Sequence, residues 1–502
     1  MLAHQATFYF EFAPRCAALR SFSSVVKQIS PLQKCIKEIY QSPPHVDSKI
    51  EIKGWVSGVR SSKNVAFVDM VDGTTQKDVK CIIRPPSLLP DGVKVGVSLS
   101  VNGVWSEGKG KQKYELQLNK SKNKDAKIDI IGGVEDLYPL LKKKHTEQFL
   151  RTIPEYRWRQ PDAAAILRFR SKVEKSFVNF FDSQDFTKTH PPITTSSDCE
   201  GAGEMFKIDA ASNNPKEATF FGKETYLTVS TQLHLEVLCA ALSRVWTLTP
   251  CFRAEKSDTN RHLSEFWMLE AEMAFVNHVS QLTDFSELMI KNVVHKLLSD
   301  EDGMGSNLLE TASKEDADAM KKRWQMLLQQ DKWASITYTQ AIKILREAHE
   351  TGKADFRYKP TWGESLKSEH EKWLAGKYFK NPVFVTDYPL DQKAFYMKIN
   401  EPDGYLKDLP PTVACYDMLV PDIGELIGGS VREESYEKLN FEIQRRNMNP
   451  KPLDWYLAQR KNGTVPHGGF GMGFERLLQY LACKDNIKDV IAFPRTVNNC
   501  LC

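Results

Sequence analysis

The sequence contains no long apolar run and no paired cysteines. None of its 502 residues lie in an uninterrupted apolar stretch of the kind that a membrane-spanning helix needs, so we expect no membrane partner. Its 10 cysteines are scattered, without a CxxC pair or a Cys/His cluster. This argues against a zinc ribbon and against a disulfide framework, and it favours a reducing compartment.

A strong excess of one charge sign is also missing. The chain has 68 Lys and Arg against 64 Asp and Glu, a formal net charge of +4. Any surface that binds nucleic acid must therefore be a local patch, because the whole chain is not basic enough to act as one. The length and an apolar content of 41% fit an ordinary globular protein, with roughly two to four domains.

The first 45 residues are poor in acid. Five Lys or Arg side chains stand against only Glu11 and Glu38, and three serines closely follow Arg20. This composition is typical of a mitochondrial transit peptide. We therefore expect residues 1–45 to direct the protein to the mitochondrial matrix, with a disordered tail outside mitochondria as the alternative.

Residues 46–135 have the pattern of a small β-barrel. Five short segments rich in β-branched residues are separated by Gly, Pro and charged turns, which fits an OB-fold. Such barrels often stack nucleic-acid bases on aromatic side chains in a basic groove. The alternative is a plain barrel with Trp55 and Phe67 in its core. A lysine-rich linker is expected over residues 136–160.

From Pro161 onward the hydrophobic period becomes helical, with Ile166, Phe169, Val173 and Phe177 on one face. Mixed strands and helices follow to the end of the chain. We expect a larger domain over residues 161–502, with a mainly helical insertion around 280–350. The predicted fold class is α+β.

The first chemically informative segment is CFRAEKSDTNRHLSEFWMLEAEMAF, which reads as two strands joined by a charged loop. Arginines that face a cleft suit a polyphosphate, because guanidinium groups grip phosphate oxygens and stay charged. An aromatic ring offers a stacking surface for a base. An isolated Arg/Glu pair on a strand is more often a surface ion pair. The candidate residues of this segment are Arg253, Glu255, Arg261, His262 and Phe266.

The second informative segment is HGGFGMGFERLL, with four glycines in six positions and Arg476 at the start of a predicted helix. Glycines here let the backbone approach a ligand closely. The spacing is not that of a Walker loop or of a dinucleotide fingerprint, and no Lys-Ser/Thr pair follows. Walker-type kinases and Rossmann folds are therefore excluded.

Both segments, with a third around FFDSQDFTKTHPPIT, resemble the three motifs of class II aminoacyl-tRNA synthetases. The second motif matches FRxE followed by RHxxEF, and the third matches GxExR. The resemblance implies a catalytic domain with an antiparallel sheet flanked by helices, and a homodimer with Pro192 at its interface. The barrel in front resembles the subgroup for aspartate, asparagine and lysine. Four stretches, 226–236, 266–275, 382–400 and 424–433, are similar to the members that act on asparagine.

The resemblance also implies a reaction with ATP and Mg²⁺. In this family the amino-acid carboxylate attacks the α-phosphate, and the terminal ribose of the tRNA then attacks the adenylate. Arg253 would neutralise the α-phosphate, while Arg261 and Arg476 would hold the γ-phosphate. The remaining expectations are His262 at the ATP, Glu255 and Phe266 at the adenine with Arg476 on its other face, and Glu425 and Asp417 at Mg²⁺.

For the amino acid, the resemblance implies Glu200, Ser230 and Gln232 as contacts. Aspartyl enzymes carry a lysine three residues after the matching glutamine, where this chain has Leu235. Loss of that cation disfavours an aspartate carboxylate. Glu270 would accept from the asparagine amide and Arg432 would donate to it, with pairing of Glu270 to a neighbouring strand cation as the alternative.

For tRNA(Asn), the resemblance implies anticodon contacts from Arg60, Phe67 and Lys80 in the barrel. Lys80 departs from the family, whose members often carry Gln there. Three alternatives remain: an aspartyl enzyme, a catalytically silent RNA-binding relative, and a tRNA-independent asparagine synthetase. The last lacks the barrel, and an intact set of Arg253, Arg261, Glu425 and Arg476 argues against the silent form.

Overall fold

The computed structural model describes residues 32–110, 112–121, 123–141, 143, 145–197, 205–209, 220–401 and 410–502. The chain divides into two compact units, Met1–Lys144 and His145–Cys502. The division lies inside the range that the sequence predicted for the linker. Among the described helices, none has both the length and the apolar character to cross a membrane.

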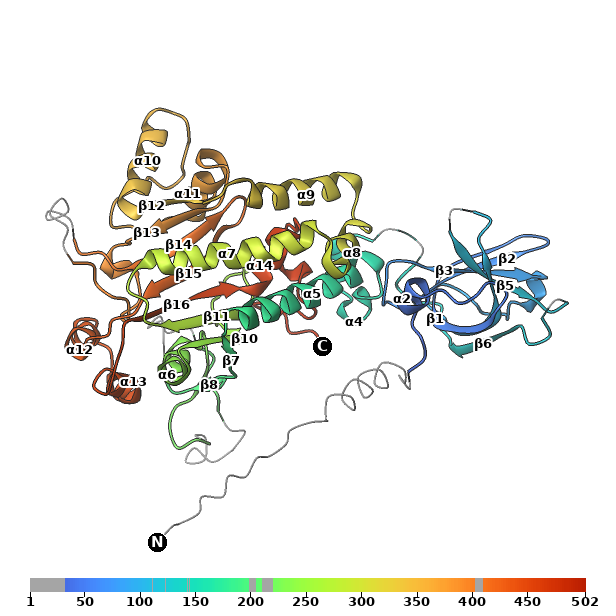
Figure 1. The fold of residues 1–502 in the computed structure, drawn as a ribbon, viewed down its shortest axis with the longest axis horizontal. Helices are drawn as coiled ribbons and strands as arrows, with labels where there is room; N and C mark the ends of the chain where they lie inside the picture. The colour runs from blue at the N-terminus through green and yellow to red at the C-terminus, as the bar shows by residue number, and fades with distance from the viewer. Residues whose placement is uncertain are drawn as a thin grey trace, which may run out of the picture. The chain divides into compact units, whose positions relative to one another are not determined.

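The first unit is built on a closed β-barrel (Figure 1). Its strands pair in the order β1-β2-β3-β5-β4, and β1 pairs with β4 to close the ring. All five predicted strands are present, so the OB-type barrel is confirmed. A sixth strand, which the sequence did not reveal because charged residues interrupt its pattern, adds to β4. The strands are β1 (Lys49–Ser61), β2 (Ala66–Val71), β3 (Val79–Arg84), β4 (Ser98–Glu107), β5 (Tyr114–Asn119) and β6 (Lys127–Gly132).

A short helix, α2 (Ile36–Gln41), belongs to the barrel unit. Ile36 and Ile39 are 1% and 3% exposed and pack in the barrel core. This helix lies within the predicted targeting segment 1–45, so that prediction is too long at its C-terminal end. Residues 1–31 of the segment lie outside the described part of the chain.

The second unit contains an eight-stranded sheet in the order β12-β13-β14-β15-β16-β11-β10-β7. Its central pairs are antiparallel, as predicted, while β12–β13 and β10–β7 are parallel, so the sheet is mixed at both edges. A separate small sheet pairs β8 with β9. The strands are β7 (Thr187–Lys188), β8 (Thr194–Thr195), β9 (Tyr226–Leu227), β10 (Arg244–Phe252), β11 (Glu265–Ala274), β12 (Ala334–Thr337), β13 (Val383–Thr386), β14 (Cys415–Val420), β15 (Gly424–Val431) and β16 (His467–Gly473).

Two long helices, α5 (Pro161–Ser183) and α7 (Val279–Leu298), run across one face of this sheet (Figure 1). The four apolar residues predicted to share one face of α5 are all buried in the main core, which confirms that prediction. The α-helices that follow α5, besides α7, are α6 (Gln232–Leu242), α8 (Ser306–Leu309), α9 (Lys314–Gln329), α10 (Tyr338–Glu350), α11 (Ser368–Trp373), α12 (Tyr436–Arg445), α13 (Asp454–Gln459) and α14 (Phe474–Leu481).

Residues 280–350 are mainly helical, but they are not an appendage. Leu282, Met289 and Val293 of α7 are buried in the main core with the central strands. Between α9 and α10, the edge strand β12 joins the sheet through β13. The many charges of this stretch suggested an insertion because they occupy the outer faces of helices whose inner faces complete the core.

The second half of the predicted linker is also structured. It forms α3 (Glu147–Arg151) and α4 (Pro154–Arg157). Arg151 and Arg157 each bind Asp489, at 2.6 and 2.7 Å, near the C-terminus of the chain. Two guanidinium groups on one buried carboxylate hold these helices to the C-terminal segment of the same unit.

Candidate active site

The first site segment crosses the sheet as β10, a loop and β11. Strand β10 ends at Phe252, so Arg253 and Glu255 lie in the loop and not on the strand as the sequence suggested. Their side chains are 3.8 Å apart. The Arg253 guanidinium lies 5.6 Å from the centre of the Phe266 ring on β11. A cation and an aromatic ring therefore stand together at the mouth of a cavity.

This cavity, which we call the nucleotide pocket, is lined by the loop after β10, by β11 and by the β16–α14 junction. Its lining includes arginines, an aromatic ring and glycines, which have no side chain to fill the cavity. That combination suits a phosphate-bearing ligand with a planar base. All seven residues predicted to bind ATP line it: Arg253, Glu255, Arg261, His262, Phe266, Glu425 and Arg476.

Two of these arginines are held by other parts of the chain. Arg476, in the first turn of α14, donates to the backbone oxygen of Glu425 at 2.9 Å. Arg261 donates to the backbone oxygen of Ile423 and, at 2.6 Å, to Ser368 Oγ on α11. Burial and the nearby charge of Arg476 lower the pKa of Arg261. An anion between the two guanidiniums would relieve this repulsion.

Helix α11 was not recognised as part of the site from the sequence. Besides Ser368, it brings Glu371, which accepts a hydrogen bond of 3.3 Å from the backbone N–H of Glu425. Burial, with the charges of Glu425 and Asp417, raises the pKa of Glu371 to about 7. The charged sequence SEHEK is typical of a solvent-facing helix, so no local signal indicated these contacts.

The carboxylates of Glu425 and Asp417 both lie close to Gly428. A Cβ on Gly428 would lie 3.3 Å from Glu425 Oε1 and 3.6 Å from Asp417 Oδ1. Asp417 also accepts from Lys393 Nζ at 2.6 and 2.8 Å, a partner that the sequence did not reveal. Burial and the charge of Glu425 raise the pKa of Asp417. Crowded carboxylate oxygens are the donor set that Mg²⁺ takes, so these residues fit that ion.

A second cavity, the amino-acid pocket, adjoins the nucleotide pocket. Arg253 and Glu425 line both cavities, together with Gly471. The predicted amino-acid contacts Ser230, Gln232, Glu270 and Arg432 all line the second cavity, as do Leu235 and Asp417. The remaining predicted contact, Glu200, lies outside the described residues.

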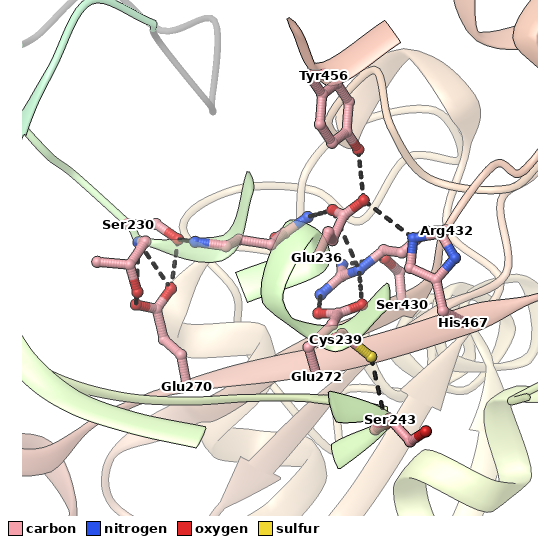
Figure 2. Close-up of polar contacts among 12 residues, drawn as sticks. Ser230, Glu236, Cys239, Ser243, Glu270, Glu272, Ser430, Arg432, Tyr456 and His467 are labelled. Carbon is pink, nitrogen blue, oxygen red and sulfur yellow. Dashed lines mark hydrogen bonds and ion pairs between the residues drawn. The ribbon is translucent and has the colours of Figure 1, made fainter. Parts of the chain in front are cut away.

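Glu270 lines this pocket, and its carboxylate has hydrogen-bond donors from the chain itself. It is 3% exposed and accepts hydrogen bonds from Ser230 Oγ, from Thr231 Oγ1 and, at 3.0 Å, from the Thr231 N–H (Figure 2). Among the described residues, these donors and not a strand cation are its hydrogen-bond partners, unlike the alternative of pairing with a strand cation. Strand β11 places Glu270 opposite the start of α6, where hydroxyl and N–H donors compensate for a buried charge.

Arg432 follows β15 and is 2% exposed. It donates to both oxygens of Glu272, at 3.1 and 2.8 Å, and to Ser430 Oγ at 2.6 Å (Figure 2). A Cβ at Gly469 would collide with the Glu272 carboxylate, so glycine is needed there. A guanidinium has five N–H donors, and three are used by these partners. Glu272 was missed from the sequence, although it lies two residues after Glu270 on the same face of β11.

The predicted anticodon residues gather on the outer face of the barrel. Arg60 pairs with Phe67 across β1 and β2, and its guanidinium lies 5.9 Å from the Phe67 ring centre. Lys80 on β3 lies 3.3 Å from Asp69, an acidic partner that the sequence did not reveal. Trp55 is 47% exposed, so the alternative that placed it in the core is wrong. The structure therefore brings one ring and two cations to one face.

Pro192, the residue predicted to lie at a dimer interface, follows β7 and is exposed, whereas the adjacent Pro191 is buried. An exposed proline is free to contact another chain.

Two family models match the chain. The model described as tRNA synthetases class II (D, K and N) covers residues 148–497, and the model described as OB-fold nucleic acid binding domain covers residues 50–122. The first match contains both pockets. The second contains the outer barrel face with Arg60, Phe67 and Lys80.

Similar proteins match over nearly the whole chain. The mitochondrial asparagine–tRNA ligase of Saccharomyces cerevisiae is 47% identical, covering 92% of this chain and 95% of its own length. The mitochondrial asparagine–tRNA ligase of Schizosaccharomyces pombe is 40% identical, covering 93% and 98%. The structure of asparaginyl-tRNA synthetase from Pyrococcus horikoshii complexed with asparaginyl-adenylate is similar with a TM-score of 0.77 at 28% identity, covering 94% of this chain and 100% of that one.

Proposed function

Because this chain belongs to the class II tRNA synthetases of the D, K and N group, we propose that its two adjoining pockets attach asparagine to tRNA(Asn) in two steps driven by ATP. In the first step, the asparagine carboxylate attacks the α-phosphate of ATP, and pyrophosphate leaves. In the second, the 3′-terminal ribose hydroxyl of the tRNA attacks the adenylate carbonyl, and AMP leaves. The function is that of an asparagine–tRNA ligase.

The observation that carries the proposal is the shared wall of the two pockets. Arg253 and Glu425 line both, so Arg253 can reach the point where a carboxylate in one pocket meets an α-phosphate in the other. No protein group needs to form a covalent bond in either step. The rate therefore comes from holding the reactants together and from stabilising charge on phosphate.

The roles of the other residues follow from their places. Phe266 offers its ring to the adenine, and Glu255 lies beside it. Arg261 and Arg476 form a cationic pair for the departing pyrophosphate, with His262 on the same wall.

Glu425 and Asp417 would hold Mg²⁺. Bound there, the ion neutralises phosphate charge and helps to orient the nucleotide. The ion pair with Lys393 partly neutralises the charge of Asp417. Glu425 is therefore the stronger ligand for Mg²⁺ of the two.

Selection of asparagine rests on the amino-acid pocket. Arg432 keeps unused N–H donors that can reach a carboxamide oxygen, while its charge is balanced by Glu272. Leu235 supplies no cation for an aspartate carboxylate. Glu270 lines the pocket as the acceptor for the asparagine amide, and its hydrogen bonds fix Ser230 and Thr231 beside it. A site that hydrogen-bonds one group rejects its analogue strongly.

Three features of the wider biology belong to the same proposal. The barrel face with Arg60, Phe67 and Lys80 contacts the anticodon of tRNA(Asn). The start of the chain directs the protein to the mitochondrial matrix, as the mitochondrial names of two similar proteins support. Two chains associate through the segment with Pro192, and an active enzyme sedimenting at the monomer mass of 57.3 kDa would contradict this.

The deciding experiment is ATP–pyrophosphate exchange with asparagine and with aspartate in parallel, followed by charging of tRNA(Asn). We expect exchange with asparagine to exceed that with aspartate by roughly ten-thousand-fold in kcat/KM, the range for sites that hydrogen-bond a polar substrate group. Equal exchange with both substrates would mean that the enzyme is not selective for asparagine. No exchange with either would support the catalytically silent alternative.

A further inference from the structure

A cluster of charged side chains lies behind the amino-acid pocket. Its side chains come from α6, β11 and β16, from the residue that follows β15 and from the residue that follows α13. Each of these residues is at most 6% exposed. Figure 2 shows most of the cluster. Its titratable members are Glu236, Glu272, Arg432, Arg460 and His467.

One oxygen of Glu236 gathers three donors. Oε2 accepts from Tyr456 OH at 2.8 Å, from Arg460 at 2.6 Å and from His467 Nε2 at 3.0 Å. Burial alone would raise the pKa of Glu236, but Arg460, His467 and Arg432 outweigh it and hold the pKa well below its usual range. Glu236 is therefore an ionised and firmly anchored carboxylate.

The three carboxylate and imidazole members of the cluster are close enough to hold a metal ion, but their hydrogen bonds indicate otherwise. His467 Nδ1 lies 2.8 Å from the backbone oxygen of Val465, and Nε2 lies 3.0 Å from Glu236. Both ring nitrogens thus have oxygen partners within the chain, and the guanidinium groups of Arg432 and Arg460 balance the two carboxylates without a metal ion.

The other oxygen of Glu236 contacts two residues of the amino-acid pocket. Oε1 accepts from Gln232 Nε2 at 3.0 Å and lies 3.9 Å from Arg432 Nε. Gln232 and Arg432 both line the pocket. The first lies one turn before Glu236 on α6, and the second directly follows β15. A single carboxylate thus contacts two side chains that line the amino-acid pocket.

We propose that Glu236 is a positioning residue for asparagine: anchored by three donors on Oε2, it sets the side chains of Gln232 and Arg432 through Oε1. The inference rests on the proposed function. Glu236 does not contact the nucleotide pocket, whose lining it does not share. Its removal should therefore weaken asparagine binding and leave ATP binding unchanged. Contacts present in both the ground state and the transition state affect KM more than kcat.

The test variant is Glu236→Gln. It keeps the shape of the side chain but replaces the carboxylate, which accepts from three donors, with a neutral amide. In ATP–pyrophosphate exchange, we expect the KM for asparagine to rise about 10- to 100-fold, the size expected for losing hydrogen bonds to a charged group. The KM for ATP should stay within about twofold and kcat within about threefold, which a general loss of structure would not produce.

The matched control is Glu442→Gln. Glu442 on α12 is also a buried carboxylate, 2% exposed, and it binds two arginines, Arg445 and Arg446. It lines neither pocket. The control should keep the KM values of the parent enzyme for asparagine and for ATP. A change in KM that occurs only in Glu236→Gln is then due to the place of Glu236 beside the amino-acid pocket, and not to the loss of a buried charge in general.

A second variant, Tyr456→Phe, decides the matter if Glu236→Gln fails to fold. It removes one anchor of Glu236 and keeps the ring, and we expect a smaller rise in the asparagine KM, about three- to tenfold, for one lost hydrogen bond. An unchanged asparagine KM in folded Glu236→Gln, or in Tyr456→Phe where the first variant is unfolded, overturns the inference. Equal rises for asparagine and ATP also overturn it. If the parent enzyme shows no asparagine-dependent exchange, the proposed function itself fails.

Discussion

Arg476 donates a hydrogen bond of 2.9 Å to the backbone oxygen of Glu425. The cation assigned to the leaving pyrophosphate is thus attached to the residue assigned to Mg²⁺. Because β15 carries Glu425 and α14 carries Arg476, this bond fixes the relative position of two charges of opposite sign at one end of the nucleotide pocket.

The first prediction concerns Arg476→Ala. Exchange activity should fall by about 100- to 1000-fold, the cost of removing one preorganised donor from a developing charge. The measurement is ATP–pyrophosphate exchange at saturating asparagine. Arg346→Ala serves as the control, because Arg346 binds the backbone of Pro360 and lines neither pocket. Near-normal exchange in Arg476→Ala would remove this residue from the catalytic set.

The second prediction concerns Leu235→Lys. A lysine here would place a cation in the amino-acid pocket, where a substrate carboxylate gains a partner and a carboxamide gains little. The ratio of aspartate to asparagine in kcat/KM should rise by at least about tenfold, since a charged hydrogen bond is worth more than 1.4 kcal/mol. Ala240→Lys adds the same charge at an exposed position of α6, and there the ratio should not change. A ratio that stays constant in a folded Leu235→Lys variant would show that position 235 does not select the substrate.

The third prediction separates the two units. Phe67→Ala should lower tRNA charging and leave ATP–pyrophosphate exchange unchanged, because Phe67 lies in the barrel. Loss of one stacked base costs about 1–3 kcal/mol. Val71→Ala, also half-buried on β2, loses apolar surface without losing a ring and should keep both activities. If exchange fell together with charging in Phe67→Ala, the ring would be acting through the fold.

The fourth prediction concerns the start of the chain. Since α2 packs in the barrel core, a reporter fused to residues 1–31 should enter mitochondria as well as one fused to residues 1–45. A reporter fused to residues 32–45 should stay in the cytosol. Import directed by 32–45, or a diffuse signal from all three fusions, would contradict the prediction. Fluorescence microscopy with a mitochondrial marker provides the readout.

The sequence by itself determined the features that depend on local pattern. The alternation of apolar residues identified the five barrel strands, and the helical period identified the buried face of α5. Resemblance of the two motif segments to those of class II synthetases implied six of the residues that line the nucleotide pocket, and resemblance of the stretch 424–433 implied a seventh, Glu425. These predictions succeed because the periods of strands and helices are visible within short stretches of the chain. The residues of one loop are likewise close together in the sequence.

Only the tertiary structure decided the contacts between distant segments. Glu236 meets Arg460 and His467 across more than 200 residues, and Ser368 reaches Arg261 across 107. Nothing in the local pattern distinguishes such a carboxylate or hydroxyl from one on the surface. The same holds for Glu270, whose partners follow from where α6 begins relative to β11. A buried polar group needs a hydrogen-bond partner, and the packing of the sheet and helices determines which partner lies within reach.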